Sequence, residues 1–336
     1  MGNGKYLLGR LLRMNYRQML QTVEDLHGKT GRGRLWLLGD MLRCGLRYGA
    51  GYKDYALCAF WDLSPEQRAT YVTRGINNRI VRLCNDPAWY HCVADKREFN
   101  RIYGRFVRRG WLDLEQCGYD AFAEFMGGRD AVIAKPTADT CGRGIEKLRK
   151  ADFSSLRELY AHLKAGGAGL VEDVIVPHPQ VARLYPDAVN TYRIVTVTRG
   201  GRAGVVYAYI RIGNGGRFVD NFNSGGMTAP VDLESGVIGF PAVDKDGGCY
   251  PVHPATGCPI AGYPLPFWRE SIEMCLEAAK VVPQLGYVGW DVAVSPQGPQ
   301  LIEGNHFPGH DILQMPPHVP DKVGMLPRFR EFLPEL

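Results

Sequence analysis

The spacing of hydrophobic residues changes part-way along the chain. In residues 5–85, leucine and methionine recur near helical spacing with arginines between them, which predicts a helical region with a second helix over 35–46. From Val132 onward, short apolar runs are separated by glycines, which predicts strands. One further helix is expected near 269–281. The pattern therefore predicts an α+β protein that begins with a helical region.

Local motifs add detail to this outline. In "DLSPEQRATYVTRG", Ser64 is placed as an N-cap, Pro65 as the first helical residue and Gln67 as the capping-box partner, so a helix is predicted to start here. The expected strands are "AVIAKP", "GLVEDVIV", "NTYRIVTVTRG", "AGVVYAYIRIG", "YVGWDVAVS" and "PQLIEGN". The third and fourth are joined at "RGGR" and the last two at "PQG", which predicts two antiparallel hairpins.

Composition narrows the class of protein. A chain of 336 residues with 45% hydrophobic and 22% charged residues is typical of a folded protein with two or three subdomains. Arg10, Arg13 and Arg17 interrupt the apolar core that a signal peptide needs, and no window reaches the ~18 apolar residues of a membrane span. Nine cysteines without a C-x-x-C pair favour reduced thiols, so a cytoplasmic location is expected. Cys84, His91 and Cys92 cluster locally but lack the spacing of a structural zinc site.

Charge is unevenly distributed. Residues 1–110 hold 20 of the 40 Lys and Arg residues but 9 of the 35 Asp and Glu residues, so this part is basic and the remainder is acidic. Two interpretations of this basic region are open. It either binds nucleic acid, anionic lipid or an acidic polymer, or its arginines keep the outer faces of the helices solvated. The segment Lys5–Arg17 is a candidate amphipathic helix for an anionic membrane.

Two segments carry residues suited to a nucleotide. In "AKPTADTCGRGIEKL", Lys135 ends a strand and is followed by a loop with Gly142 and Gly144, whose backbone can approach a phosphate closely. This loop is neither a Walker A loop nor a Rossmann turn. In "LVEDVIV", Glu172 lies in an apolar strand and can offer a carboxylate to an adenine edge, although an exposed glutamate on an edge strand is the alternative.

Two further segments carry residues suited to phosphate and metal. Arg193 and Arg211 alternate with apolar residues on adjacent strands, so they can converge on one polyanion, or they belong to a solvated hairpin. The hairpin joined at "PQG" brings Asp291 beside Glu303 and Asn305. Glu303 and Asn305 lie on the same face of their strand, because side chains alternate along a strand with a period of two. Three hard oxygen ligands beside phosphate-binding cations suit magnesium.

The order of these elements resembles the ATP-grasp ligases, particularly the ribosomal-protein glutamate ligase type. The matching motifs, spread over about residues 95–310, are Lys135, Thr140-Cys141-Gly142-Arg143-Gly144, Glu172-Asp173-Val174, Arg193, Asn221 to Gly226, Gly289-Trp290-Asp291 and Glu303 to Gly309. The N-terminal part, with "LRYGAGYKDYALCAFWDLSPEQRATYVTRG", looks like the sugar-transfer-associated ATP-grasp group, which is associated with cell-surface polysaccharide pathways.

The resemblance implies a fold and its boundaries. Two α+β lobes would clamp ATP and follow a basic helical N-terminal region. The helical region would span 1–94, the lobe with the phosphate loop and hinge 95–176, and the lobe with the metal and substrate site 177–336.

The resemblance also implies roles for individual residues. ATP would be held by Lys96, Lys135, Thr140, Gly142, Gly144, Glu172, Asp173 and Val174. Glu172 would bind the adenine amino group, with the backbone around Val174 at the hinge. Arg193 would stabilise the transferring phosphoryl group, with Arg211 and Asn221 near the acyl phosphate and the incoming substrate. Two magnesium ions, for which Mn²⁺ can substitute, would bind to Asp291, Glu303 and Asn305.

The chain departs from the motifs at three places. Asp173 replaces the usual aromatic or apolar hinge residue, Cys141 lies inside the phosphate loop, and "NHF" follows the metal strand where a smaller residue is usual. Cys141 is either a redox-sensitive thiol or simply a small residue in the loop.

The function that follows is an ATP-dependent carboxylate–amine ligase, which activates a carboxylate as an acyl phosphate and forms an amide. An amino acid joined to a sugar acid or another small carboxylate is the leading substrate hypothesis. A small-molecule or sugar kinase on the same fold is the alternative, and an inactive module binding an anionic polymer would need none of the metal residues. Small-molecule substrates are expected as partners, nucleic acid is not, and peripheral contact with an anionic membrane or polysaccharide is an open expectation.

Overall fold

The computed structural model describes residues 15–137, 144–215 and 225–336, and the chain divides into two compact units. One, which we call the helical unit, comprises residues up to Leu83 together with Gly309–Leu336. The other, the two-sheet unit, comprises Cys84–Pro308. The three-part division expected from the sequence stays a prediction.

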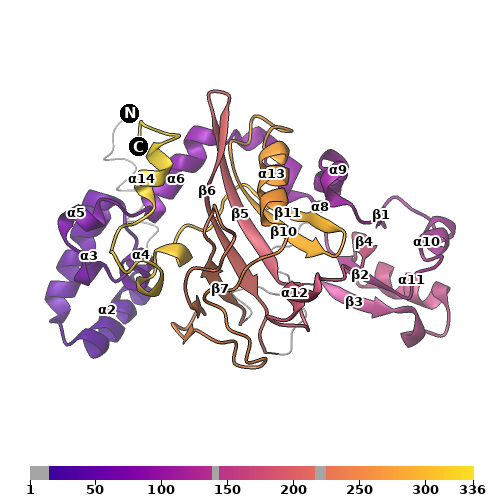
Figure 1. The fold of residues 1–336 in the computed structure, drawn as a ribbon, viewed down its shortest axis with the longest axis horizontal. Coiled ribbons are helices and arrows are strands. Elements are labelled where there is room, and N and C mark those ends of the chain that lie inside the picture. The colour runs from indigo at the N-terminus through magenta and orange to yellow at the C-terminus, as the bar shows by residue number, and fades with distance from the viewer. Residues whose placement is uncertain (1–14, 138–143, 216–224) are drawn as a thin grey trace. The chain divides into compact units, whose positions relative to one another are not determined.

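Short helices build the helical unit (Figure 1). They are α2 (Tyr16–Thr30), α3 (Arg34–Tyr48), α4 (Tyr52–Leu57), α5 (Pro65–Arg68), most of α6 (Arg74–Cys84) and α14 (Leu326–Arg330). Their apolar faces meet around Leu37, Tyr55 and Phe60, which are fully buried. Ser64 accepts a hydrogen bond from the Gln67 amide while the Gln67 side chain accepts one from the Ser64 amide at 2.8 Å, which confirms the predicted capping box.

Buried polar contacts tie the C-terminal residues to the N-terminal helices within this unit. The Gln314 side chain accepts from the Val72 amide at 2.8 Å and donates to the Val72 carbonyl at 2.9 Å. Asp54 and His310 form a buried pair with 3.1 Å between Oδ1 and Nε2. These contacts satisfy polar groups that would be costly to bury alone, so residues 309–336 are an integral part of the helical unit.

The smaller sheet of the two-sheet unit is antiparallel, with strand order β1-β4-β2-β3. Its strands are β1 (Trp111–Asp113), β2 (Ala131–Lys135), β3 (Glu146–Arg149) and β4 (Leu170–Asp173). One face packs on α10 (Tyr119–Phe125) and α11 (Leu156–Ala165) around a core that includes Phe122, Val132 and Leu159 (Figure 1). The opposite face carries Lys135 and Glu172, because side chains alternate along each strand.

The larger sheet has the order β11-β10-β5-β6-β7-β8-β9, and each neighbouring pair is antiparallel. Its strands are β5 (Thr191–Arg199), β6 (Arg202–Ile212), β7 (Met227–Pro230), β8 (Ala242–Val243), β9 (Cys249–Tyr250), β10 (Tyr287–Ser295) and β11 (Gly298–Asn305). The helices of this unit outside the smaller sheet are α7 (His91–Ala94), α8 (Lys96–Ile102), α9 (Gly104–Val107), α12 (Pro179–Ala182) and α13 (Trp268–Ala278). Trp290 is fully buried in the main core.

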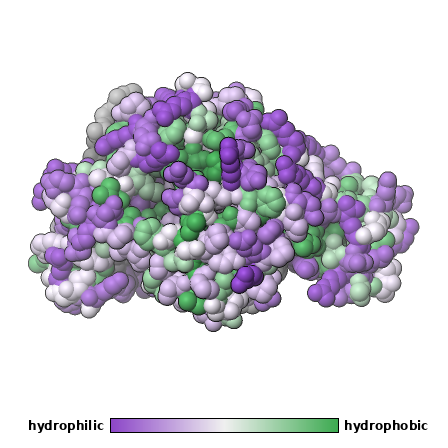
Figure 2. Space-filling view, in the orientation of Figure 1, coloured by the Kyte–Doolittle hydropathy of each residue, from purple (hydrophilic) through white to green (hydrophobic). Residues whose placement is uncertain are grey.

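The α+β class expected from the hydrophobic pattern is confirmed. Both predicted hairpins form, β5 with β6 and β10 with β11. The strand expected over "GLVEDVIV" is shorter than predicted, because it ends at Asp173. No helix in the described ranges is long and apolar enough to cross a bilayer. Figure 2 shows hydrophilic and hydrophobic residues interspersed over the visible face.

Candidate active site

A row of charged side chains crosses three neighbouring strands of the larger sheet. Asp291 on β10 lies opposite Glu303 on β11 and opposite Arg193 on β5. Directly opposite residues project from the same face of a sheet, so register alone brings these three groups together. Arg211 joins them from β6, where it lies two residues beyond the partner of Arg193 and therefore on the same face.

Two arginines converge on one carboxylate in this row. Arg193 donates from Nε to Oδ1 of Asp291 and from Nη2 to Oδ2 at 3.0 Å, and Arg211 donates from Nη2 to Oδ2. Arg193 and Asp291 are both buried. A Cβ atom at Gly289 would lie 3.2 Å from Cδ of Arg193 and 3.3 Å from Cβ of Pro308. The glycine of the Gly-x-Asp motif therefore leaves the space that Arg193 occupies.

The pKa values of the two carboxylates of the row are shifted in opposite directions. Burial opposes ionisation of Asp291, but the charges of Arg193 and Arg211 outweigh it, so its pKa lies below the ordinary value. Burial and then the negative charge of Asp291 raise the pKa of Glu303 above its ordinary value. A cation bound beside Glu303 would offset the repulsion between the carboxylates of Asp291 and Glu303. The pair therefore has the electrostatic character of a cation site.

The donor set of the row fits magnesium. Asn305 lies two residues beyond Glu303 and opposite Gly289, and its Oδ1 accepts from the Phe307 amide at 2.8 Å. Two carboxylates and an amide supply hard oxygens, which magnesium prefers. Within the described ranges, no group of three or more His, Cys, Asp and Glu residues is placed to bind a metal ion. An ion held here would complete its shell with the Asn305 amide, phosphate oxygens or water, as magnesium usually does.

A second buried cluster surrounds Glu172 on the smaller sheet. Lys135 Nζ lies 2.5 Å from Glu172 Oε2. Arg109 donates to both oxygens of Glu172 at 2.9 Å, and Asn100 Nδ2 donates to Oε1, also at 2.9 Å. All four side chains belong to buried residues. The predicted nucleotide residues Lys135 and Glu172 are thus in direct contact with each other.

The Glu172 carboxylate accepts four hydrogen bonds, two at each oxygen. A carboxylate has about four acceptor positions, so an adenine amino group would have to displace one of these donors. Burial opposes ionisation of Glu172, but the charges of Arg109 and Lys135 outweigh it, so the pKa of Glu172 lies well below its ordinary value. In this arrangement Glu172 holds Lys135 in place.

Arg109 also connects the two sheets. Its Nη1 donates to the carbonyl of Leu301 at 2.6 Å, and its Nη2 lies 3.4 Å from the carbonyl of Ile302. Both carbonyls are on β11, at the irregularity in the β10–β11 ladder next to Glu303. One guanidinium therefore links the Lys135–Glu172 pair to the strand that carries Glu303. Sequence reasoning missed Arg109 and Asn100, since a buried arginine in "VRRGW" has the same local pattern as a surface one.

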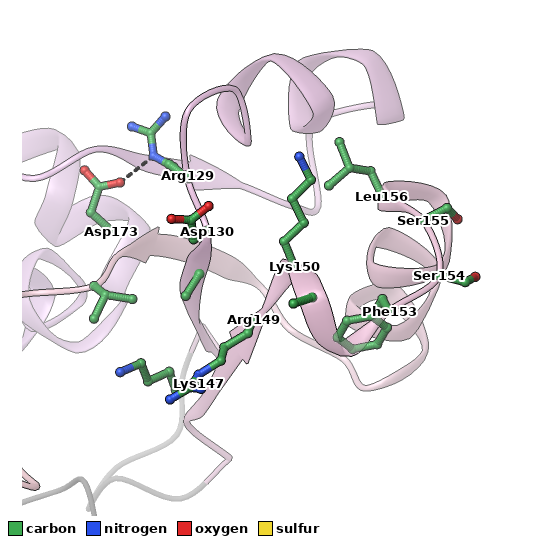
Figure 3. A pocket seen from close by; sticks show the side chains of 13 residues that line it. Arg129, Asp130, Lys147, Arg149, Lys150, Phe153, Ser154, Ser155, Leu156 and Asp173 are labelled. Carbon is green, nitrogen blue, oxygen red and sulfur yellow. Dashed lines mark hydrogen bonds and ion pairs between the residues drawn. The ribbon is translucent and has the colours of Figure 1, made fainter.

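The hinge residues Asp173 and Val174 line a cavity of about 1000 Å³ (Figure 3). Asp173 accepts from the Gly110 amide at 2.7 Å and forms an ion pair with Arg129 at 2.5 Å. Lys147 and Arg149 extend from β3 on another side of the cavity. Lys135 and Glu172 do not line it. The aspartate that departs from the usual hinge residue therefore fixes Gly110 and Arg129.

The remaining predicted nucleotide residues concern the loop after Lys135. The backbone amide of Lys96 donates to the carbonyl of Thr137 at 3.3 Å, so Lys96 lies beside the start of this loop. Gly144 ends it with φ +68°, a conformation that glycine adopts without strain. Three of the predicted site residues lie outside the described residues, namely Thr140, Gly142 and Asn221. Cys141 lies outside them as well.

Residues 76–330 match the family model of sugar-transfer associated ATP-grasp proteins. This chain belongs to the sugar-transfer associated ATP-grasp family. The resemblance drawn from the sequence motifs is thereby confirmed. Membership gives the chain the ATP-grasp fold, and the family name associates it with sugar transfer.

Solved structures of other ATP-grasp proteins resemble this family member only distantly. D-cycloserine synthetase DcsG is 13% identical, with 84% of this chain and 92% of that chain covered and a TM-score of 0.43. D-alanyl-alanine synthetase A from Vibrio cholerae is 15% identical, with 73% and 63% covered and a TM-score of 0.43. An N5-carboxyaminoimidazole ribonucleotide synthetase in complex with ADP is 10% identical, with 65% and 46% covered and a TM-score of 0.41.

The chain thus spans less than two thirds of the length of several of these proteins. No curated protein matches it.

Proposed function

We propose that this ATP-grasp protein joins a carboxylate to an amine through an acyl phosphate and releases ADP and phosphate. The observation that carries the proposal is the row of Arg193, Asp291 and Glu303 across three strands, with Arg211 beside it. Such a row concentrates cations and metal ligands in one place. Acyl and phosphoryl transfer depend mainly on positioning and on stabilising charge, which is what this arrangement supplies.

The nucleotide would bind to the smaller sheet and its loop. Lys135 would contact the inner phosphates, with Lys96 beside the loop and the glycines of the loop approaching the phosphate oxygens. Glu172 would act as a positioning residue that fixes Lys135, because its acceptor positions are filled by Lys135, Arg109 and Asn100. The backbone around Asp173 and Val174 would supply the adenine contacts.

Magnesium would be held by Asp291, Glu303 and Asn305, with two ions expected. Bound there, the metal would neutralise charge on the phosphate oxygens. Glu303 would bind in its ionised form, which a cation favours against the burial and the Asp291 charge that raise its pKa. Asp291 would share its oxygens between such an ion and the guanidinium groups of Arg193 and Arg211.

The two arginines would act at successive stages. Arg193 would stabilise the phosphoryl group while an oxygen of the substrate carboxylate attacks the γ-phosphorus and ADP leaves. Arg211, with Asn221, would then stabilise the negative oxygen that forms when an amine attacks the acyl carbon. Collapse of that species expels phosphate and leaves an amide, and the amine loses a proton to water or phosphate. Arg193 would therefore serve the phosphoryl transfer, and Arg211 with Asn221 would serve the attack of the amine.

The substrates we propose are an amino acid as the amine and a sugar acid or another small carboxylate as the acceptor of phosphate. Association of the family with sugar transfer supports this choice. The product would then belong to the biosynthesis of a polysaccharide or natural product.

A coupled assay tests the proposal. Purified protein is incubated with ATP, magnesium, a panel of uronic acids and a panel of amino acids, and the ADP, phosphate and amide formed are quantified. We expect equal amounts of ADP, phosphate and amide for the productive pair. Transfer of phosphate to a stable phosphorylated sugar, with no free phosphate, would show a kinase instead. The Arg193→Met variant serves as the control for contaminating activity.

A further inference from the structure

Helix α3 has an apolar stripe on the side away from its own core. Leu35, Leu42 and Leu46 are 85%, 42% and 66% exposed. Their spacing of seven and four residues puts them on one face of the helix. The buried residues of α3 lie on the opposite face and are Leu37, Met41 and Cys44. Single exposed leucines are common on protein surfaces. Three exposed leucines on one face of a helix form an apolar surface of the kind that marks an interaction site.

Cationic and aromatic side chains border this stripe. Arg43, Arg47 and Trp36 follow it along one side of the helix, and all three residues are exposed. The guanidinium of Arg32 lies 4.6 Å from the centre of the Trp36 ring. Among the residues that the structure describes, neither Arg43 nor Arg47 forms an ion pair with a carboxylate.

The exposed side of α3 carries no acidic residue of its own, although Glu66 of α5 lies within electrostatic range of Arg47. The one acidic residue of the helix, Asp40, is bound by both terminal nitrogens of Arg68 at 2.8 Å and by the Tyr55 hydroxyl at 2.8 Å. Asp40 is therefore neutralised toward the core of the helical unit. The outer side of α3 combines leucines, a tryptophan and two arginines.

We propose that this α3 surface, formed by Leu35, Trp36, Leu42, Arg43, Leu46 and Arg47, docks on an anionic lipid bilayer. With 15 residues, α3 is too short to span a bilayer but long enough to lie in its interface. The leucines enter the boundary of the acyl chains, Trp36 sits at headgroup level, and the arginines pair with lipid phosphates. Its residues are separate from the segment Lys5–Arg17 predicted from the sequence, and it needs no step of the proposed ligase reaction.

Charge favours lipid over a second copy of the chain. A two-fold dimer through this surface would bring Arg43 and Arg47 of one chain close to the same residues of the other. Like charges across an interface are unfavourable, and none of the six residues of this surface is a carboxylate. An anionic bilayer supplies both an apolar layer and the opposite charge.

Vesicle flotation of the full chain tests the proposal. Vesicles of phosphatidylcholine alone are compared with vesicles containing phosphatidylglycerol, at low and at physiological salt. We expect recovery with the anionic vesicles only, and an about tenfold or greater loss in the double variant L42E/L46E, because acidic side chains are repelled by the surface. The variant Val252→Glu, which places one such acidic side chain at another exposed apolar residue, should float like the parent.

Three results would overturn the proposal. The first is equal recovery with neutral and anionic vesicles. The second is unchanged flotation of L42E/L46E together with its loss in L8E/L12E, which would assign binding to the N-terminal segment. The third is a dimer in light scattering that L42E/L46E dissociates, which would assign the surface to a second copy. Circular dichroism of each variant confirms that it is folded, and none of these readouts depends on ligase activity.

Discussion

Glu303 and Asp291 face each other on neighbouring strands, and Arg193 and Arg211 both donate hydrogen bonds to Asp291. Glu303 is therefore the carboxylate with most to gain from a metal ion. We predict that Glu303→Gln lowers turnover about a hundredfold or more and weakens magnesium-dependent nucleotide binding, because a neutral amide is a poorer ligand for a hard cation. Calorimetric titration of nucleotide with and without magnesium measures this. Glu234→Gln, at an exposed turn residue, is the control, and full turnover in Glu303→Gln would refute the metal assignment.

Glu172 makes stability depend on pH. Its pKa is lowered in the folded protein from an ordinary value of 4.5, so its contribution is complete above that value and is lost as the pH falls through the lower, folded pKa. We predict that Glu172→Gln destabilises the protein by about 3 kcal/mol at pH 7, because it breaks a buried ion pair. The difference in Tm between the variant and the parent should shrink as the pH falls below 4.5.

Denaturation at a series of pH values measures this difference. Glu115→Gln provides the comparison, since its ion pair with Arg97 has a half-exposed carboxylate and should contribute less than about 1 kcal/mol. A Tm difference for Glu172→Gln that stays constant from pH 7 to pH 3 would contradict the ion-pair account.

At the scale of elements, Arg109 joins β4 to β11 through Glu172 and two backbone carbonyls. A lysine keeps the charge but cannot reproduce this fork of donors. We predict that Arg109→Lys raises the KM for ATP about tenfold, since Lys135 is then less well fixed, while the KM for magnesium also rises. Arg105→Lys, on an exposed arginine of α9, should leave both constants unchanged. An unaltered KM for ATP in Arg109→Lys would show that the contact is only structural.

The packing between β5 and β10 depends on Gly289. A Cβ atom there would lie 3.2 Å from Arg193 and 3.3 Å from Pro308, closer than side chains normally pack. We predict that Gly289→Ala displaces Arg193 and lowers kcat about tenfold or more, with a smaller effect on Tm. Parallel measurement of kcat and Tm separates the two effects. A loss of Tm without a loss of kcat would mean that Arg193 is not needed in its present place.

Local pattern predicted most of these elements. The period-two runs defined the strands, the glycine turns defined the hairpins, and the hairpins placed Asp291 opposite Glu303. Arg109 and Asn100 escaped prediction because their partner, Glu172, is more than sixty residues away in the sequence. A buried charged residue whose partner is distant in the sequence has no recognisable pattern in the residues next to it. For the same reason, the sequence did not show that the acceptor positions of the Glu172 carboxylate are filled. It therefore suggested Glu172 as a ligand of adenine.

At the scale of the whole molecule, the two proposals belong to different units. The proposed nucleotide and metal residues in the described part lie in the two-sheet unit, whereas the α3 surface lies in the helical unit. Each unit has its own buried core. The leucines of α3 are not among the candidate site residues, so L42E/L46E should retain ligase activity in solution while losing its affinity for anionic vesicles.

The fate of one carboxylate oxygen tests the ligase account most directly. In an acyl-phosphate reaction, the bond between that oxygen and phosphorus forms first and the bond between oxygen and the acyl carbon breaks later. With an ¹⁸O-labelled carboxylate and ATP, the account predicts one ¹⁸O atom in the released phosphate when the amine is present, and a hydroxamate when hydroxylamine replaces the amine. A stable phosphorylated product, with no labelled free phosphate and no hydroxamate, would contradict it.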